Sequence, residues 1–152
     1  SLGAKSLPQP ALAQVPAQAT SNEITIAVVG AHLSGMALNH ELTALDARLL
    51  EETATATDYK LYALDTTPPK PGMLRIETGA GHAIKLELWA MSPAAFGRFV
   101  AAIPPPLSIG TIRLADGRQA KGFIVEPAAI HGAKDISAFG GWRAFMAEKA
   151  KG

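Results

Sequence analysis

The sequence contains no cysteine, no long hydrophobic run and few aromatic residues. The absence of cysteine excludes disulfide bonds and thiolate metal sites, and it removes the usual reason to expect a small secreted domain. The longest apolar runs are far shorter than the roughly 20 residues that a membrane helix needs, and no charged-then-apolar signal segment opens the chain. We therefore expect a cytoplasmic protein with no membrane partner.

An excess of charge of one sign is also lacking. The chain has 14 Lys and Arg residues against 13 Asp and Glu residues, which leaves a net charge of +1. No basic stripe with interleaved aromatic residues is present, and this excludes nucleic acid as a partner. With 48% hydrophobic residues among 152, the chain can bury one core, so its composition predicts a single domain with a tail.

The tail is predicted at residues 1–21, which are rich in Ala, Gln, Pro and Ser and have no sustained apolar period. This composition is typical of an interdomain linker. We therefore expect residues 22–152 to form the domain, and a further domain to precede the linker in a longer protein. The alternative is a native disordered tail.

Residues 24–42 carry the strongest local signals in the chain. The β-branched run at 24–29 predicts a buried strand that ends at Gly30. Gly30 and Gly35 then bracket a tight loop, because glycine permits left-handed backbone and close approach of a ligand to peptide groups. A loop of this kind at a strand end is a common place for a small site.

His32, inside this loop, is the best single candidate for chemistry. An imidazole titrates near neutral pH, so it can serve as a proton donor or as the partner of an anion. The other interpretation, which stays open, is a loop histidine that ties its own turn together. Around it we predict a site for a small anionic ligand with these binding residues: Gly30, Ala31, Leu33, Ser34, Gly35 and Lys70.

Lys70 is included because the prolines of PPKPG present it stiffly, although an ordinary exposed lysine is the alternative. Glu87 is expected to be a solvent-exposed carboxylate on the second face of a strand. The other histidines, His40, His82 and His131, fall in separate segments without a second ligand at helical spacing, so no metal site is predicted. No phosphate-loop, dinucleotide or nucleophile-elbow motif is present, and no cofactor is expected.

Alternation and turn signals predict more strands than helices. We expect a strand at 59–64, a hairpin between 73–77 and 83–91, and a second hairpin across Asp116-Gly117. Helices are predicted to begin at Ser92-Pro93 and to span 142–151. The fold class is therefore α+β, with a mostly antiparallel, mixed, barrel-like sheet and a few flanking helices.

One further segment allows two interpretations. Leucines at positions 38, 42, 45 and 49 suit an amphipathic helix with Asn39 as its N-cap. Alternatively, residues 47–55 form a strand, because Thr53, Thr55 and Thr57 alternate and favour extended backbone.

Four segments together closely resemble the C-terminal domain of bacterial allophanate hydrolase. They are VVGAHLSGMALNHEL, YALDTTPPKPGMLRI, ELWAMSPAAFGRFVAAIPPPLSIGTIRLADGRQAKGFIVEP and DISAFGGWRAF. The match covers about residues 24–147 and is specific in combination. The resemblance implies a fold similar to the γ-glutamyl cyclotransferases, with GAHLSG in the place of their glycine-rich substrate loop.

The resemblance also implies an N-terminal amidase domain on the same polypeptide, whose Ser–Ser–Lys triad nothing here matches. For the present part it leaves two functions open: decarboxylation of the amidase product N-carboxycarbamate, or assembly into a homo-oligomer, with Trp89 and Trp142 as candidate contacts. A third interpretation is a γ-glutamyl-type ligand binder. Cyclotransferase activity itself is not expected, because the family's acid/base glutamate belongs near the end of the helix that starts at Ser92, where AAIPPPLSIG has no carboxylate.

Decarboxylation would give each residue of the predicted site a specific role. N-carboxycarbamate is a small dianion, and loss of carbon dioxide leaves negative charge on its nitrogen unless a proton arrives. We expect His32 to supply that proton and the amides of residues 31–35 to hold carboxylate oxygens. Ser34 is expected to donate a hydrogen bond, and Lys70 to bind the dianion.

Overall fold

The computed structural model describes residues 17–152, and within them the strands form two sheets. Most of the predicted linker, residues 1–21, lies outside the described residues. A five-stranded sheet has the order β2-β5-β1-β7-β6, and a three-stranded sheet has the order β4-β3-β8. The strands are β1 (Ile24–Val28), β2 (Arg48–Ala54), β3 (Tyr59–Leu64), β4 (Lys70–Arg75), β5 (Lys85–Met91), β6 (Leu107–Arg113), β7 (Gln119–Val125) and β8 (Lys134–Asp135).

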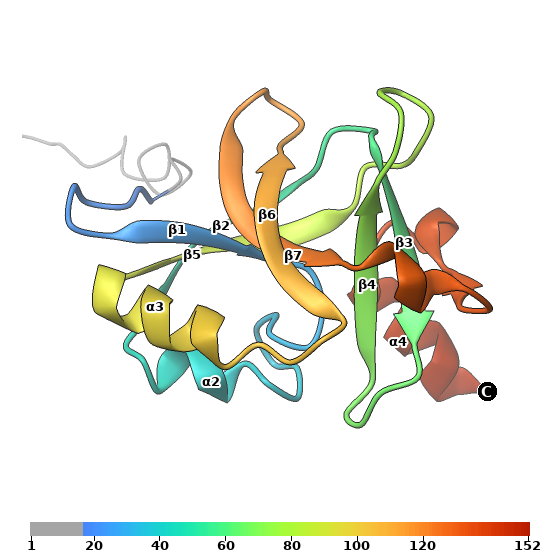
Figure 1. Cartoon of the computed structure of the whole chain (residues 1–152), viewed down its shortest axis with the longest axis horizontal. Coiled ribbons are helices and arrows are strands. Elements are labelled where there is room, and N and C mark those ends of the chain that lie inside the picture. Colours follow the sequence, from blue (N-terminus) through green and yellow to red (C-terminus); the bar gives the residue numbers. More distant parts are fainter. Residues whose placement is uncertain (1–16) are drawn as a thin grey trace, which may run out of the picture.

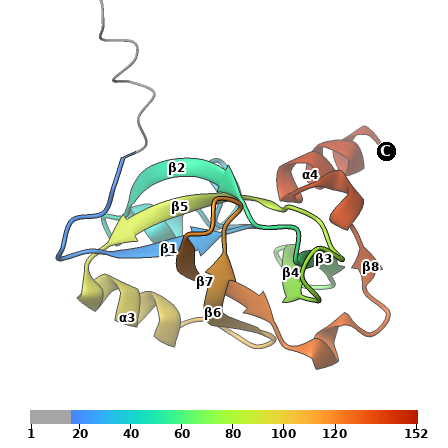
Figure 2. The ribbon, with the colours of Figure 1, turned by 90° about the horizontal axis from the view of Figure 1, so that it is seen from above.

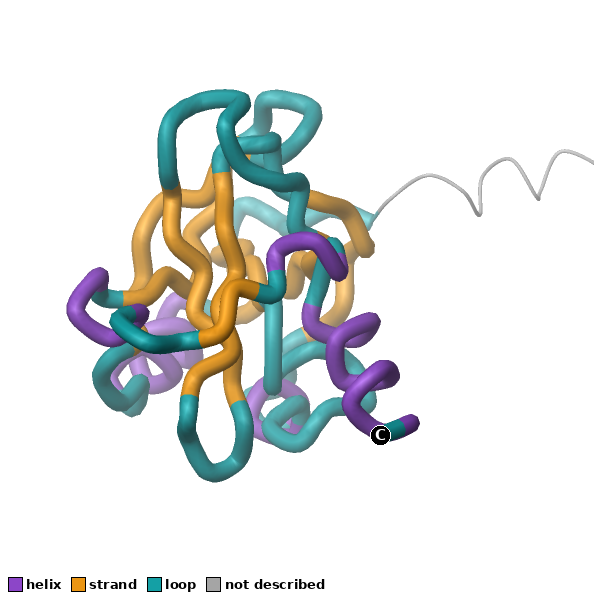
Figure 3. Tube along the Cα trace, turned by 90° about the vertical axis from the view of Figure 1, so that its right-hand side faces the viewer, coloured by secondary structure: helices purple, strands orange, loops and turns teal. Residues whose placement is uncertain are grey.

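The helices flank these sheets at two places. In Figure 1, α2 (His40–Thr43) and α3 (Pro93–Ala101) lie on one side of the five-stranded sheet. The longer α4 (Trp142–Lys151) lies at the other end of the molecule, near β3 and β8. Figure 2 shows β2, β5 and β1 side by side, and Figure 3 shows the helices around the strands. Two 3₁₀ turns, η2 (Pro127–Ile130) and η3 (Ser137–Phe139), connect β7 to α4.

The five-stranded sheet curls without closing along its length. Its neighbouring strands are antiparallel except β1 and β7, which run parallel. The outer strands β2 and β6 meet just beyond their ends through a bridge between Thr55 and Leu114. The predicted class, α+β with a mostly antiparallel mixed sheet, is therefore confirmed, and the curl is the barrel-like feature of the sheet.

Several local predictions are confirmed. β1 ends before Gly30, β3 spans the predicted residues 59–64, and β6 and β7 form the hairpin across Asp116-Gly117. Ser92 caps α3, because its hydroxyl accepts a hydrogen bond of 3.1 Å from the Ala95 amide. These features depend on residues close in sequence, which is why the sequence predicts them.

The helix predicted from Asn39 is wrong beyond one turn. α2 ends at Thr43, and the chain reverses at Asp46, which has φ 59°, before β2 pairs with β5. The alternative strand at 47–55 is the correct interpretation. Asn39 makes no cap hydrogen bond, and its side chain instead donates to the His32 carbonyl at 2.8 Å.

The hairpin predicted between 73–77 and 83–91 is also wrong. β4 pairs with β3, whereas β5 pairs with β1 and β2, so two strands close in sequence belong to different sheets. β4 also begins earlier than expected, at Lys70, as an edge strand that can accommodate Pro71. Lys70 is therefore held by a strand.

The five-stranded sheet is covered on both faces near β5. Leu86, Leu88, Trp89 and Ala90 are all buried, as is Trp142 at the start of α4. The two tryptophans thus fill the interior of the chain and do not form the exposed contact expected of an assembly module. No helix among residues 17–152 is long and apolar enough to cross a membrane.

Candidate functional site

The loop after β1 is a compact series of turns. The Leu33 amide donates to the Gly30 carbonyl at 3.0 Å, and the Leu38 amide donates to the Ala31 carbonyl at 2.8 Å. Gly35, exposed at the outer end, has φ 79°, which L-residues with a side chain adopt only with strain. These hydrogen bonds fix the conformation of the backbone on either side of His32.

Gly30 is required by packing where the two sheets meet. A Cβ atom at this position would overlap the ring of Pro71 in β4. One residue further along β4, a Cβ on Gly72 would lie 2.7 Å from a methyl group of Val125. Two glycines thus let β4 pass close to the loop and to β7, and this close passage brings Lys70 beside the loop.

The ring of His32 lies between two phenylalanines. It stacks on Phe123 with a centroid distance of 5.1 Å and an interplanar angle of 11°, and it meets Phe99 edge-on at 5.0 Å. Only 10% of the side chain is exposed. Because β7 and α3 supply these two rings, the histidine is fixed by elements remote in sequence.

Glu41 of α2 fixes the hydrogen bonding of the His32 ring. Nε2 of His32 donates to Oε1 of Glu41 at 2.7 Å, since a carboxylate can only accept. Nδ1 has no hydrogen-bond partner among residues 17–152, whereas every fully buried side-chain nitrogen or oxygen there has one. Nδ1 therefore reaches solvent and is the nitrogen that can exchange a proton.

Burial lowers the pKa of His32 below its ordinary value of 6.5, and the Glu41 carboxylate offsets only part of this effect. The positive charge of Lys70 lowers it slightly further. The imidazole is therefore mostly neutral at pH 7. A negative charge brought close to it would favour the protonated form.

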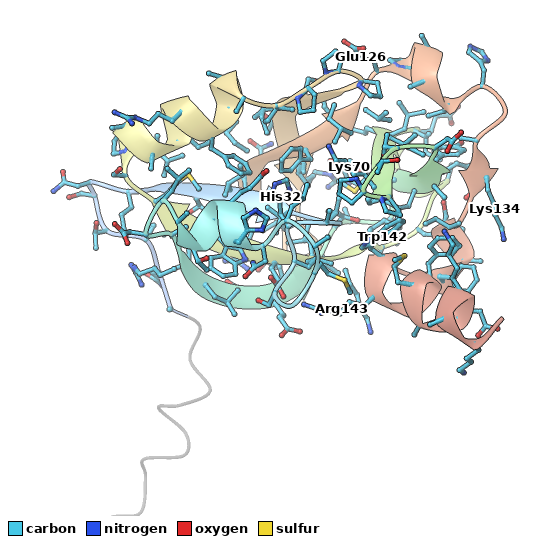
Figure 4. All side chains as sticks on the ribbon, turned by 90° about the horizontal axis from the view of Figure 1, so that it is seen from below. His32, Lys70, Glu126, Lys134, Trp142 and Arg143 are labelled. Atoms are coloured by element: carbon cyan, nitrogen blue, oxygen red, sulfur yellow. The ribbon has the colours of Figure 1, made fainter. Side chains whose placement is uncertain are left out.

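The side chain of His32 lines a cavity of about 490 Å³. Its volume lies within the range of small-molecule sites, about 300–1,000 Å³. Lys70 and Arg98 line it together with His32 and Glu41, and His32 and Lys70 also border a separate void of about 20 Å³ that Gly30 and Ala31 line. Figure 4 shows His32 and Lys70 near one another in the middle of the molecule.

Arg98 is a residue of this cavity that sequence reasoning missed. It lies on the exposed side of α3, one residue before Phe99, which packs against His32. Neither Arg98 nor Lys70 forms an ion pair with any residue of the described chain. The cavity therefore holds two uncompensated cations beside one histidine and one hydrogen-bonded carboxylate.

The predicted binding residues are divided between two sides of the loop. Lys70 lines the cavity of about 490 Å³ with His32, whereas Gly30 and Ala31 line only the small void of about 20 Å³. Leu33 faces a second cavity of about 740 Å³ beside α4. The amide and hydroxyl of Ser34, which the sequence assigned to a ligand, donate instead to Glu87 at 2.9 and 3.1 Å.

Glu87 is the largest departure from the sequence-based expectation. It was predicted to be exposed, but only 1% of the residue is accessible. Burial raises its pKa, but hydrogen bonds from Ser34, Trp89 and Arg143 outweigh this and leave the pKa below 4.5. A signal existed in the sequence: Trp89 shares a strand face with Glu87, and a large aromatic residue is unusual on a solvated face.

The end of α3 contributes apolar residues to the His32 cavity. Ala102 and Ile103 line it where the resemblance to cyclotransferases would place a glutamate. The carboxylate that the cavity does contain, Glu41, comes from α2. Among residues 17–152, no group of three His, Asp or Glu side chains lies close enough together to hold a metal ion.

Several known proteins are similar to this chain. The family model of the allophanate hydrolase C-terminal domain matches residues 24–147. Urea amidolyase of Saccharomyces cerevisiae is 38% identical over 130 residues, which cover 83% of this chain and 7% of that protein. The structure of allophanate hydrolase from Kluyveromyces lactis matches with a TM-score of 0.80 and 39% identity, over 84% of this chain and 21% of that one.

An AIG2-like protein (GGACT) from Mus musculus shares the fold at a TM-score of 0.57 and 14% identity, over 72% of this chain and 83% of that one. The cyclotransferase-like fold is thereby confirmed, and likeness at this level shows the fold alone. The chain spans less than a quarter of the length of the yeast relatives. On the match over residues 24–147, the chain belongs to the allophanate hydrolase C-terminal domain family.

Proposed function

We propose that this chain binds N-carboxycarbamate in the His32 cavity and protonates its nitrogen as carbon dioxide leaves. One observation carries the proposal: an almost buried imidazole, with Nε2 occupied by Glu41 and Nδ1 open to solvent, borders a cavity that also holds two free cations. Membership of the allophanate hydrolase family supplies the substrate class. The proposal rests on that combination.

The charges of the cavity suit a small dianion. Lys70 is half-buried at the start of β4, where a charged hydrogen bond is stronger than at a fully exposed site. Arg98 adds a second cation at the rim. With one carboxylate of the substrate near Lys70 and the other toward Arg98, the central nitrogen would lie between them, near the His32 edge.

The dianion also prepares the acid. In the free chain the pKa of His32 is lowered, chiefly by burial. A bound dianion adds negative charge near the ring and partly cancels the effect of Lys70, so the pKa of His32 rises on binding. The substrate thus induces protonation of the group that will donate to it.

The chemical step conserves atoms and charge. The bond between nitrogen and one carboxylate carbon breaks, carbon dioxide leaves, and the bonding pair stays on nitrogen. The Nδ1 proton of His32 moves to this nitrogen, which yields carbamate, H₂N–COO⁻, and neutral imidazole. Solvent then returns a proton to Nδ1, while Glu41 holds the ring in one orientation.

The substrate would come from an amidase domain, which we propose to be carried by the same polypeptide. The allophanate hydrolase and urea amidolyase relatives are several times longer than this chain, which leaves room for such a domain in proteins of this family. Deamination of allophanate by an amidase gives N-carboxycarbamate. Fast removal of this product is the contribution that we assign to the present chain.

The test is His32→Ala in the full chain, with N-carboxycarbamate generated from allophanate by an added amidase. We expect catalysed carbon dioxide release, above the uncatalysed rate, to fall about 10²- to 10⁴-fold, as for loss of a general acid. His40→Ala is the matched control, because His40 is exposed on α2 and does not line the cavity. A His32→Ala protein as fast as the control would refute the proposal.

A further inference from the structure

The buried carboxylate of Glu87, behind the His32 loop, accepts hydrogen bonds on both of its oxygens. Oε1 of Glu87 accepts from the Ser34 amide at 2.9 Å, the Ser34 hydroxyl at 3.1 Å and the Trp89 indole at 3.0 Å. Oε2 accepts from Arg143 at 2.7 Å. These donors come from the loop, from β5 itself and from α4, so one side chain joins three parts of the fold.

These bonds act on the backbone that carries His32. Ser34 is two residues beyond His32, and its amide is held directly by Glu87. On the other side, the Asn39 side chain holds the His32 carbonyl at 2.8 Å. The loop is therefore fixed from two directions, and Glu87 supplies the contact on the side away from the substrate cavity.

We propose that Glu87 is a positioning residue for the His32 cavity, and that Arg143 of α4 acts through it as the counter-ion that keeps its carboxylate in place. This inference rests on the proposed function, because it concerns the orientation of the acid. Glu87 itself lines the separate cavity beside α4 and does not border the His32 cavity. It therefore acts through Ser34 and the loop backbone.

The chemistry of the four bonds requires a carboxylate. All partners are donors, and a carboxylate is the side chain that accepts on both oxygens without offering a proton. Glutamine would keep the three bonds at Oε1 but would turn an NH₂ group toward Arg143. Donor would then face donor at 2.7 Å, so the side chain must shift, and the loop would shift with it.

The decisive variant is Glu87→Gln, with Glu52→Gln as its control. Glu52 faces Glu87 across the β2–β5 pair and lines the same cavity, but it is exposed and makes no hydrogen bond within the described chain. Both variants therefore remove one negative charge from paired positions of the same two strands. A displaced acid lowers the chemical rate more than binding, so we expect kcat to fall roughly tenfold to a hundredfold in Glu87→Gln with KM changed much less.

A second measurement is independent of activity. Loosening the loop exposes the ring, so the pKa of His32, followed by NMR of its Cε1 proton, should rise toward 6.5 in Glu87→Gln and stay unchanged in Glu52→Gln. Arg143→Ala should move kcat and the pKa of His32 in the same direction by less, because three bonds to Glu87 remain. The double variant should be less than additive.

Folding is checked by thermal unfolding of each variant. If Glu87→Gln does not fold, Ser34→Ala serves in its place, since it removes only the hydroxyl bond and should lower kcat by a smaller factor. Unchanged kcat and unchanged His32 titration in the folded variant would overturn the inference. If His32→Ala is inactive while Glu87→Gln is normal, only the positioning role fails. If His32→Ala keeps full activity, the proposed function fails, and the His32 titration alone decides the positioning role.

Discussion

The imidazole of His32 stacks on the phenyl ring of Phe123 with planes only 11° apart. β7 therefore determines the plane in which the ring lies, while Glu41 determines which nitrogen is occupied. A loop histidine held in this way has one orientation, and its ring lines the cavity of about 490 Å³.

Replacing Phe123 by leucine should free the ring. Loss of aromatic contact and volume should lower the free energy of unfolding by about 1–2 kcal/mol. Because burial is the main cause of the lowered pKa of His32, that pKa should rise toward 6.5 in an NMR titration. Phe139→Leu is the control, since Phe139 is exposed and packs on Phe145, away from His32. An unchanged His32 pKa in Phe123→Leu would contradict the role of stacking.

Glu41→Gln should act on the pKa of His32 in the opposite direction. The Glu41 carboxylate raises this pKa through its hydrogen bond and its charge, so its removal should lower the pKa further. If protonated His32 is the acid, the pH above which kcat/KM declines should move down by the same amount. Glu126→Gln, an exposed carboxylate outside the cavity, should leave both values unchanged. If the pKa of His32 fell but the pH dependence of kcat/KM did not change, His32 would not be the acid.

Lys70 and Arg98 should contribute unequally to anion binding. Malonate, a three-carbon dicarboxylate, mimics the proposed substrate, and calorimetry can measure its dissociation constant. We expect Lys70→Ala to raise this constant about tenfold or more, as for a partly buried charged hydrogen bond. Arg98→Ala should raise it roughly two- to fivefold, as for an exposed pair.

Lys149→Ala, on the exposed part of α4, is the matched control and should bind malonate normally. Added salt should weaken malonate binding by the intact chain, because the contacts are ionic. Equal affinity in all three variants would place the dianion elsewhere.

Alanine substitution should affect stability and malonate binding differently at Gly30 and at Gly35. Gly30→Ala introduces a methyl group into the Pro71 ring and should cost up to about 3 kcal/mol of stability, as for overpacking. It should also weaken malonate binding, because Pro71 adjoins Lys70. Gly35→Ala meets open space and should cost about 1 kcal/mol from its left-handed backbone alone, with malonate affinity retained. Equal affinities would show that the Gly30 contact does not shape the cavity.

Local signals account for what the sequence predicted well. The strand before Gly30, the Ser92 cap and the Asp116-Gly117 turn each depend on neighbours in the chain, and all three are present. His32 was selected from its flanking glycines. Its burial was not predictable, because Phe99 and Phe123 reach it from elements far away in sequence.

The predictions that were wrong concern features that depend on residues far apart in sequence. Leucine spacing after Asn39 suits a helix, but pairing of β2 with β5 overrides it and the chain turns at Asp46. The alternation in β5 correctly placed Glu87 and Trp89 on one face. Trp89 on this face was a signal that something covers it, but the strand pattern could not show that the loop after β1 and Arg143 of α4 supply the contacts to Glu87.

The most direct test of His32 as the acid is its pKa with and without malonate, measured by NMR on the wild-type chain, with the ring signal assigned through His32→Gln. We expect the pKa of His32 to lie below 6.5 in the free chain and to increase when malonate saturates the cavity. If malonate binds without changing the pKa of His32, or if malonate does not bind, this ring is not the acid of a dianion site.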